Sequence, residues 1–257
     1  MISLTAAQLD LWMASFLFPL VRVLGLINAA PIFSNRAIPM RMRLALGVLV
    51  TVALLPTLPP SGLTVGSWQG ILALVQQMLI GVALGFTIRI VFSAVDLAGE
   101  LIGLQMGLGF AMFYDPENAA QSPVIAEFLG LLATLIFLSI NGHLMLLAVL
   151  GNSFQWWPVG ADIFPAAGWL SIARWGSTLF SAGLMLALPL IAALMVVNIA
   201  LAVLTRAAPA LNLFAIGFPV TLIAGSAMMM LSLPFFAPAF QRLFDYGLQT
   251  VAQLAMG

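Results

Sequence analysis

Residues 175–204 read WGSTLFSAGLMLALPLIAALMVVNIALAVL and contain no charged side chain. An α-helix rises about 1.5 Å per residue, so a helix of this length can cross the roughly 30 Å apolar core of a bilayer. A helix on the surface of a soluble domain would instead carry a polar face. The segment therefore predicts a helix surrounded by lipid or by other apolar helices.

The rest of the chain has the same character. Hydrophobic residues make up 63% of the sequence and charged residues only 6%, too few charges to cover the surface of a soluble domain. Six apolar segments fall near residues 12–34, 42–58, 68–92, 124–151, 175–204 and 211–236. We therefore expect an all-α membrane-class protein, a single domain over 1–257, with about six long helices or helical hairpins. Prolines inside the segments predict kinks or breaks: Pro19, Pro189, Pro219 and Pro234.

Composition also excludes several classes of function. The chain has no Cys and one His, so thiolate chemistry, disulfides and a His-based metal site are excluded. Its eight basic residues, all Arg, balance eight acidic residues, which leaves no basic surface for nucleic acid. No nucleophile motif or paired catalytic groups accompany the single His. We expect no cofactor, no metal, no nucleic-acid partner and no enzymatic activity.

The stretch between the third and fourth segments is unlike the others. Residues 103–123 read GLQMGLGFAMFYDPENAAQSP, in which glycines lower helix propensity while Met and aromatic residues keep the stretch apolar. A segment of this kind is neither a convincing bilayer span nor a polar loop. It indicates a confined position inside protein.

Charges within apolar segments need a physical account, because a charge at the bilayer centre costs roughly 3 kcal/mol on insertion scales. If the third helix continues past Phe92, Arg89, Asp96 and Glu100 lie on one of its faces. Solvation among the lipid headgroups, binding of a partner's charge and, with less support, a proton relay all fit this face. Arg22 and Asn28 of the first segment are expected to satisfy backbone carbonyls across a helix interface.

Four of the six tryptophans lie in one polar connection, at residues 156, 157, 169 and 175. Trp side chains are enriched where a membrane meets water, so the cluster favours an interfacial aromatic belt. A surface that binds another protein is the alternative.

Five blocks of the sequence carry a resemblance to a known family. The blocks are RVLGLINAAPIFSNRAIPMRMRLALG at 22–47, QQMLIGVALGFT at 76–87, GELIGLQMGLGFAMFYDPENAAQSPVI at 99–125, NGHL at 141–144 and LTRAAPALNLFAIGFPVTL at 204–222. In this order and spacing they resemble the FliR family of flagellar type III secretion export-gate proteins over nearly the whole chain. Ala210 stands where that family usually has Gln, which puts a polar role at this position in doubt.

The resemblance implies an assembly of several proteins. One subunit of this type joins five FliP and four FliQ subunits in a closed helical channel, with FlhB around its entrance and FlhA as a further partner. Unfolded flagellar proteins are the exported substrates, and lipid surrounds part of the assembly. The implied location is the bacterial inner membrane at the flagellar basal body, with much of the assembly on the periplasmic side. Helices in such an assembly face sibling subunits as well as lipid.

Within this resemblance, residues 106–122 are expected to plug the export channel. Gly107 and Gly109 supply bends, and Pro116 after Asp115 ends helical structure. Four apolar residues would form the seal: Met106, Phe110, Met112 and Phe113. Tyr114 begins the sequence YDPEN at 114–118, which resembles a turn.

The alternative function is a small-solute secondary transporter that uses Arg22, Arg89, Asp96 and Glu100 as a midplane site. Such a protein would contain paired broken helices related by an internal repeat, and no convincing repeat is present in the sequence.

Overall fold

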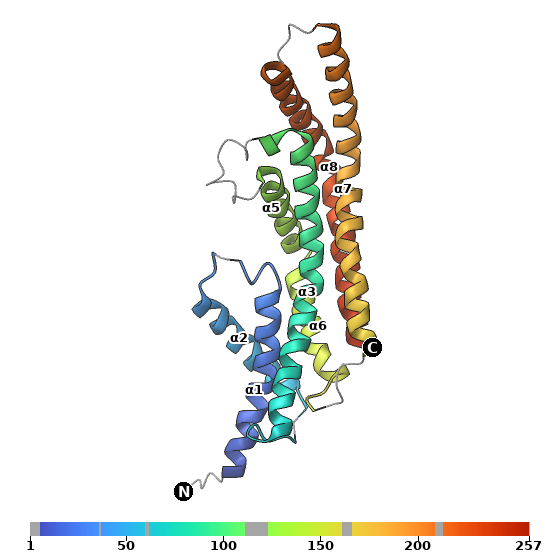
Figure 1. Ribbon diagram of the computed structural model, residues 1–257. Coiled ribbons are helices and arrows are strands. Elements are labelled where there is room, and N and C mark those ends of the chain that lie inside the picture. The colour runs from blue at the N-terminus through green and yellow to red at the C-terminus, as the bar shows by residue number, and fades with distance from the viewer. Residues whose placement is uncertain are drawn as a thin grey trace. The chain divides into compact units, whose positions relative to one another are not determined.

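The computed structural model describes residues 6–35, 37–59, 62–110, 123–160, 166–208 and 213–256. These residues form seven α-helices and two 3₁₀ turns and contain no β-strand, so the all-α expectation is confirmed (Figure 1). The helices are α1 (Ala6–Ala29), α2 (Met40–Leu54), α3 (Trp68–Gln105), α5 (Val124–Ser139), α6 (Gly142–Trp156), α7 (Ala166–Ala207) and α8 (Leu213–Met256), and the 3₁₀ turns are η1 (Leu55–Thr57) and η2 (Leu108–Phe110).

Five of the described helices contain a stretch long and apolar enough to cross a membrane, and α5 with α6 makes a sixth if this bent pair counts as one span. The expectation of about six apolar segments is therefore confirmed. Two boundaries differ from the prediction. The third helix continues to Gln105, well past Phe92, and the fourth segment is broken at Asn141, which has a left-handed backbone with φ 57°.

The four prolines predicted to kink or break helices do not end any of them. Pro19 lies inside α1, Pro189 inside α7, and Pro219 and Pro234 inside α8, and each helix continues on both sides. None of the four prolines therefore breaks its helix, and a kink at each stays a prediction. The break at Asn141 comes from a residue type that adopts the left-handed conformation at low cost.

Backbone contacts divide the chain into two compact units. Unit 1 comprises Met1–Ile90, Asn141–Gly176 and Phe244–Gly257, and unit 2 comprises Val91–Ile140 and Ser177–Leu243.

Unit 1 is organised by close packing of α1 on the N-terminal part of α3. A Cβ placed on Gly25 would lie 2.9 Å from the carbonyl oxygen of Met78, and one on Gly85 would lie 2.8 Å from that of Leu26. A Cβ on Gly81 would overlap the Arg22 carbonyl. Because only glycine leaves room for such contact, these residues determine how closely α1 and α3 approach.

Unit 1 also contains α2 and the first part of α7. Helix α2 buries only Gly47 and Thr51, and the rest of its apolar side chains are exposed or half-buried. Trp175, at 5% exposure, donates its indole N–H to the Thr87 carbonyl at 3.0 Å and meets Tyr246 edge to face. Trp175 is thus a packing residue in this chain, and its assignment to an aromatic belt is wrong.

In unit 2, the C-terminal part of α3 packs on α5 and α7. A Cβ on Gly99 would overlap the backbone of Ala126, and one on Gly183 would lie 2.8 Å from the Ala94 carbonyl. Phe92 and Phe137 meet edge to face with ring centres 5.8 Å apart. Gly99 and Gly183 are therefore contact points between helices.

Candidate functional site

The described part of the Gly/Met-rich stretch begins where α3 ends, in unit 2. The Met106 amide still donates to the Ile102 carbonyl, at 2.9 Å, whereas the Gly107 amide turns back to the Leu104 carbonyl at 3.0 Å. Gly107 has φ 85°, in the left-handed region that glycine occupies without a steric penalty. Helices commonly end with a left-handed glycine one or two positions beyond their last helical residue, here Gln105. The bend predicted at Gly107 is present.

Met106 packs against helix α8. Its side chain is 2% exposed and lies against Gly225, where an added Cβ would be 2.5 Å from the Met106 Cγ and 2.9 Å from the Sδ. The Thr221 hydroxyl lies 3.1 Å from the Met106 carbonyl and 3.0 Å from the Phe218 carbonyl of its own helix, and it can donate to either. Side chain and carbonyl of Met106 are therefore both in contact with α8.

The remaining residues of the predicted plug are described only in part. Gly109 and the backbone of Phe110 lie in η2, and a Cβ on Gly109 would be 3.0 Å from the Leu104 side chain. The other five residues lie outside the described part of the chain: Met112, Phe113, Tyr114, Asp115 and Pro116. Their role stays a prediction.

The predicted charged face of α3 is a property of one continuous helix. Arg89, Asp96 and Glu100 are all exposed and spaced by seven and four residues, so they follow one another along one side. Gly130 of α5 leaves room beside Asp96, since a Cβ there would lie 3.2 Å from the carboxylate oxygen. Within the described residues, none of the three charged side chains makes a hydrogen bond or an ion pair.

Arg22, the remaining predicted charge, is fully buried in unit 1. Its Nε donates to the Gln77 side-chain oxygen at 2.7 Å, and its two terminal nitrogens donate to the Ser153 hydroxyl at 3.0 Å and the Trp157 carbonyl at 2.7 Å. All three acceptors are uncharged, and Trp157 caps the C-terminus of α6, where the helix dipole favours a cation. The expected carbonyl contact across a helix interface is confirmed for Arg22. For Asn28 it is wrong, because its amide donates to Leu24 of the same helix.

Thr221, Gly225, Gln77 and Ser153 were not predicted as members of these clusters. One signal in the sequence was Gly225 itself, since a glycine inside a helical pattern usually has a packing reason. Gln77 also carried a signal, since an amide in an apolar helix can hydrogen-bond across a helix interface, between subunits or within one chain. Thr221 and Ser153 gave no signal, because hydroxyl side chains in apolar helices also bond within their own helix.

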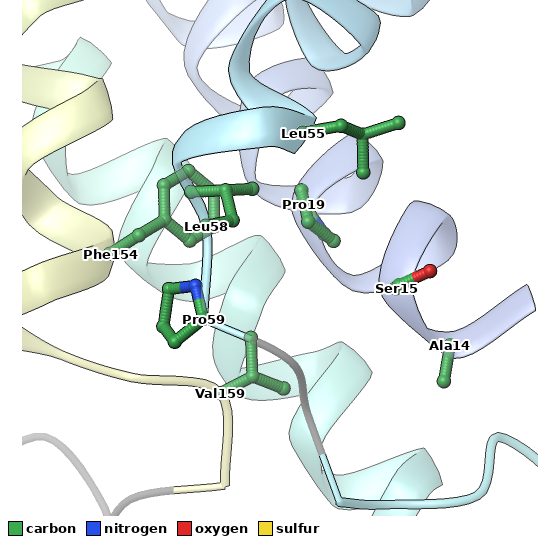
Figure 2. Close-up of a pocket in the computed structure, with 8 residues that line it drawn as sticks. All are labelled: Ala14, Ser15, Pro19, Leu55, Leu58, Pro59, Phe154 and Val159. Carbon is green, nitrogen blue, oxygen red and sulfur yellow. The ribbon is translucent and has the colours of Figure 1, made fainter. Parts of the chain in front are cut away.

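A small crevice in unit 1 offers little to a specific ligand. It has a volume of about 190 Å³ and opens between α1, the residues around η1 and the end of α6. Figure 2 shows Phe154 beside Leu58 and Pro59, and the lining is apolar except for Ser15, whose hydroxyl donates to the Trp12 carbonyl. In the described parts of the chain, no group of three or more His, Asp or Glu side chains could hold a metal ion.

Comparison with known proteins gives a consistent result. The family model described as "Bacterial export proteins, family 1" matches residues 13–247. Flagellar biosynthetic protein FliR of Escherichia coli (strain K12) is 45% identical over 245 residues, covering 95% of this chain and 94% of the relative. FliR of Pectobacterium carotovorum subsp. carotovorum is 44% identical over 91% of this chain and 90% of the relative. FliR of Bacillus subtilis (strain 168) is 30% identical over 96% of each.

Proposed function

Since this chain belongs to the bacterial export proteins, family 1, we propose that it acts in flagellar type III protein export as a membrane-embedded gate subunit. The observation that carries the proposal is the match over residues 13–247, which includes the charged face of α3, the end of α3 and the part of α8 that contacts it. The apolar helices support a location in the membrane. The bacterial inner membrane at the flagellar basal body, with much of the assembly on the periplasmic side, is the proposed location.

In the proposed assembly, one copy of this chain joins five FliP and four FliQ subunits around a channel for unfolded flagellar proteins, with FlhB around its entrance and FlhA as a further partner. The exposed apolar side chains of α2 and α7 support burial against lipid and sibling helices, because a chain in water would not leave so many of them uncovered. Its role is structural and gating.

The proposed gate is the segment that follows α3. Phe110, Met112 and Phe113 would form a compliant apolar seal, since Met and aromatic side chains can pack around an irregular surface and be displaced by an arriving polypeptide. The closed and substrate-filled states need to differ by only a few kcal/mol for the population to shift strongly. Gly107 ends α3 with a left-handed turn and so supports a change of chain direction at the start of this segment.

The assembly is tested by native mass spectrometry after co-expression with FliP and FliQ. The expected result is a discrete complex that contains one copy of this chain. A monomer or a homo-oligomer, obtained while FliP and FliQ are well expressed, would contradict the proposed function and favour the transporter alternative.

The gate is tested by deleting residues 107–116 and measuring ion leakage in cells. The expected result is higher ion permeability with complexes still assembled, because the shortened segment cannot fill the channel. Replacement of the same ten positions by a Gly/Ser sequence of equal length separates the loss of the apolar side chains from the shortening. Unchanged permeability for both variants, with complexes present, would contradict the plug.

A further inference from the structure

We infer that Met106 is the fixed point from which the proposed plug extends, and that Thr221 and Gly225 of α8, here called the seat, hold it in place. That a plug exists at all rests on the proposed function. The seat itself rests on contacts within unit 2 alone.

The first support is the shape of the seat. A glycine inside a helix weakens that helix relative to alanine, so Gly225 needs a compensating contact. A Cβ at this position would lie 2.5, 2.8 and 2.9 Å from the Cγ, Cε and Sδ of Met106. Three successive heavy atoms of one side chain therefore occupy the space that a Cβ of residue 225 would take. The absence of a side chain on Gly225 is what lets Met106 lie flat on α8.

The second support is a hydrogen bond to the same residue. The last carbonyls of a helix lack intrahelical partners, and the Met106 carbonyl belongs to this end of α3. Thr221 reaches it at 3.1 Å from a buried position. Thr221 and Gly225 are separated by one helical turn and so lie on the same side of α8. One side of α8 thus contacts both the carbonyl and the thioether side chain of Met106.

The third support is the backbone that follows. Gly107 has φ 85°, and a Cβ built on it would meet the Phe218 ring at 3.4 Å. Phe218, Thr221 and Gly225 are spaced by three and four residues and form one stripe on α8. This stripe of α8 contacts the chain at Met106 and Gly107. Beyond these contacts the chain can change direction at Gly107 with little steric cost, because glycine has no Cβ. Met106 is therefore a positioning residue and is not part of the seal.

A size exchange tests the seat. Gly225→Leu is expected to expel the Met106 side chain and lower the melting temperature of the purified complex by roughly 2–12 °C. Adding Met106→Ala should restore at least half of that loss, because the smaller side chain vacates the space that the new leucine needs. Strictly additive losses would overturn the seat, since residues that do not touch show independent effects. Gly176→Ala is a control for a helix glycine with open space around it.

A disulfide tests whether Met106 stays fixed. The natural chain contains no Cys, so Met106→Cys with Gly225→Cys introduces the only possible pair. A mild oxidant should crosslink this pair in assembled complexes, and export by the oxidised sample should equal export by the same variant kept reduced. Failure to crosslink contradicts the seat. A crosslink that abolishes export contradicts a fixed Met106, because export then requires Met106 to leave α8.

The control for this experiment is Met106→Cys with Ser226→Cys. Ser226 is exposed and follows Gly225 by one residue, so its side chain points to another side of α8 and should not crosslink. The deletion of residues 107–116 is read independently. If residues 106 and 225 crosslink but the deletion leaves ion permeability unchanged, the plug is contradicted and the contact of Met106 with α8 is supported. If the deletion raises ion permeability but residues 106 and 225 do not crosslink, the plug is supported and its attachment through Met106 is contradicted.

Discussion

The guanidinium carbon of Arg22 lies 4.0 Å from the centre of the Phe154 ring. A cation over an aromatic face is attracted by the ring quadrupole, and more strongly where water is excluded. The same guanidinium donates to Gln77 of α3, to Ser153 of α6 and to the carbonyl of Trp157 at the end of α6, so one side chain joins α1 to both α3 and α6. Arg22 is thus a structural cation stabilised by neutral groups.

Replacement of Arg22 by lysine is expected to destabilise the chain by about 1–3 kcal/mol, because one ammonium cannot reproduce three hydrogen bonds arranged by a planar fork. Thermal unfolding of the detergent-purified protein measures the change. Arg242→Lys is the matched control, since Arg242 is exposed and, among the residues that the structure describes, donates only to Pro238 of its own helix. Equal stabilities of the two variants would contradict a structural role for Arg22.

Gly81→Ala is expected to destabilise the chain by about 1–3 kcal/mol, even though alanine favours a helix more than glycine does. The new Cβ would overlap the Arg22 carbonyl, and two helix backbones must separate to admit it. Gly176→Ala, with nothing within 4 Å of the added Cβ, should be neutral or stabilising. Denaturation of both variants checks the sign, and a stabilising Gly81→Ala would mean that α1 and α3 are not in close contact.

Asp96→Asn is expected to leave the isolated chain within about 0.5 kcal/mol of the parent, because Asp96 is exposed and relieves repulsion with Glu100 when neutral. If the charged face binds a basic residue of a partner subunit, the same variant should reduce co-purification with FliP and FliQ. Quantitative co-purification, alongside unfolding of the chain alone, separates the two effects. Unchanged complex yield would favour simple solvation of the face, and selective loss of solute uptake would favour the transporter alternative.

Gly107→Ala is expected to cost about 1–2 kcal/mol, since a residue with a Cβ is strained at φ 85°. The added Cβ would make only an ordinary van der Waals contact with the Phe218 ring, at 3.4 Å. Gly107→Asn should cost less, because Asn tolerates the left-handed conformation better. The order of unfolding midpoints, glycine above asparagine above alanine, is the measurement. The opposite order of Ala and Asn would show that side-chain volume, and not backbone conformation, limits this position.

The number of apolar helices could be predicted from the sequence, because a long segment without charges is stable only as a helix in lipid or among other apolar helices. The end of α3 is predicted too early, since Gly99 and Gly103 have low helix propensity. In the folded chain Gly99 instead lets α5 approach at Ala126, and tertiary packing outweighs propensity. The prolines mislead in the same way, since a helix can continue through a proline when neighbouring groups satisfy the freed carbonyl.

The candidate site could be predicted only where a residue's own conformation matters. A bend at Gly107 follows from glycine chemistry, and a common face for Asp96 and Glu100 follows from helix periodicity. The seat of Met106 does not, because Thr221 lies 115 residues further along the chain and nothing local connects the two. Contacts between residues on different helices depend on the angle and position at which the helices cross. The spacing of apolar residues along the sequence does not determine that angle or position.

The bonds of Arg22 also impose an order on the making of the protein. Trp157, its last acceptor, follows it by 135 residues. At a synthesis rate of about 5–20 residues per second, the ribosome completes that acceptor roughly 7–27 s after Arg22. Until then the nascent first helix carries a cation whose full set of acceptors does not yet exist. Arg22 therefore marks a step in biogenesis that cannot finish before α6 has been translated.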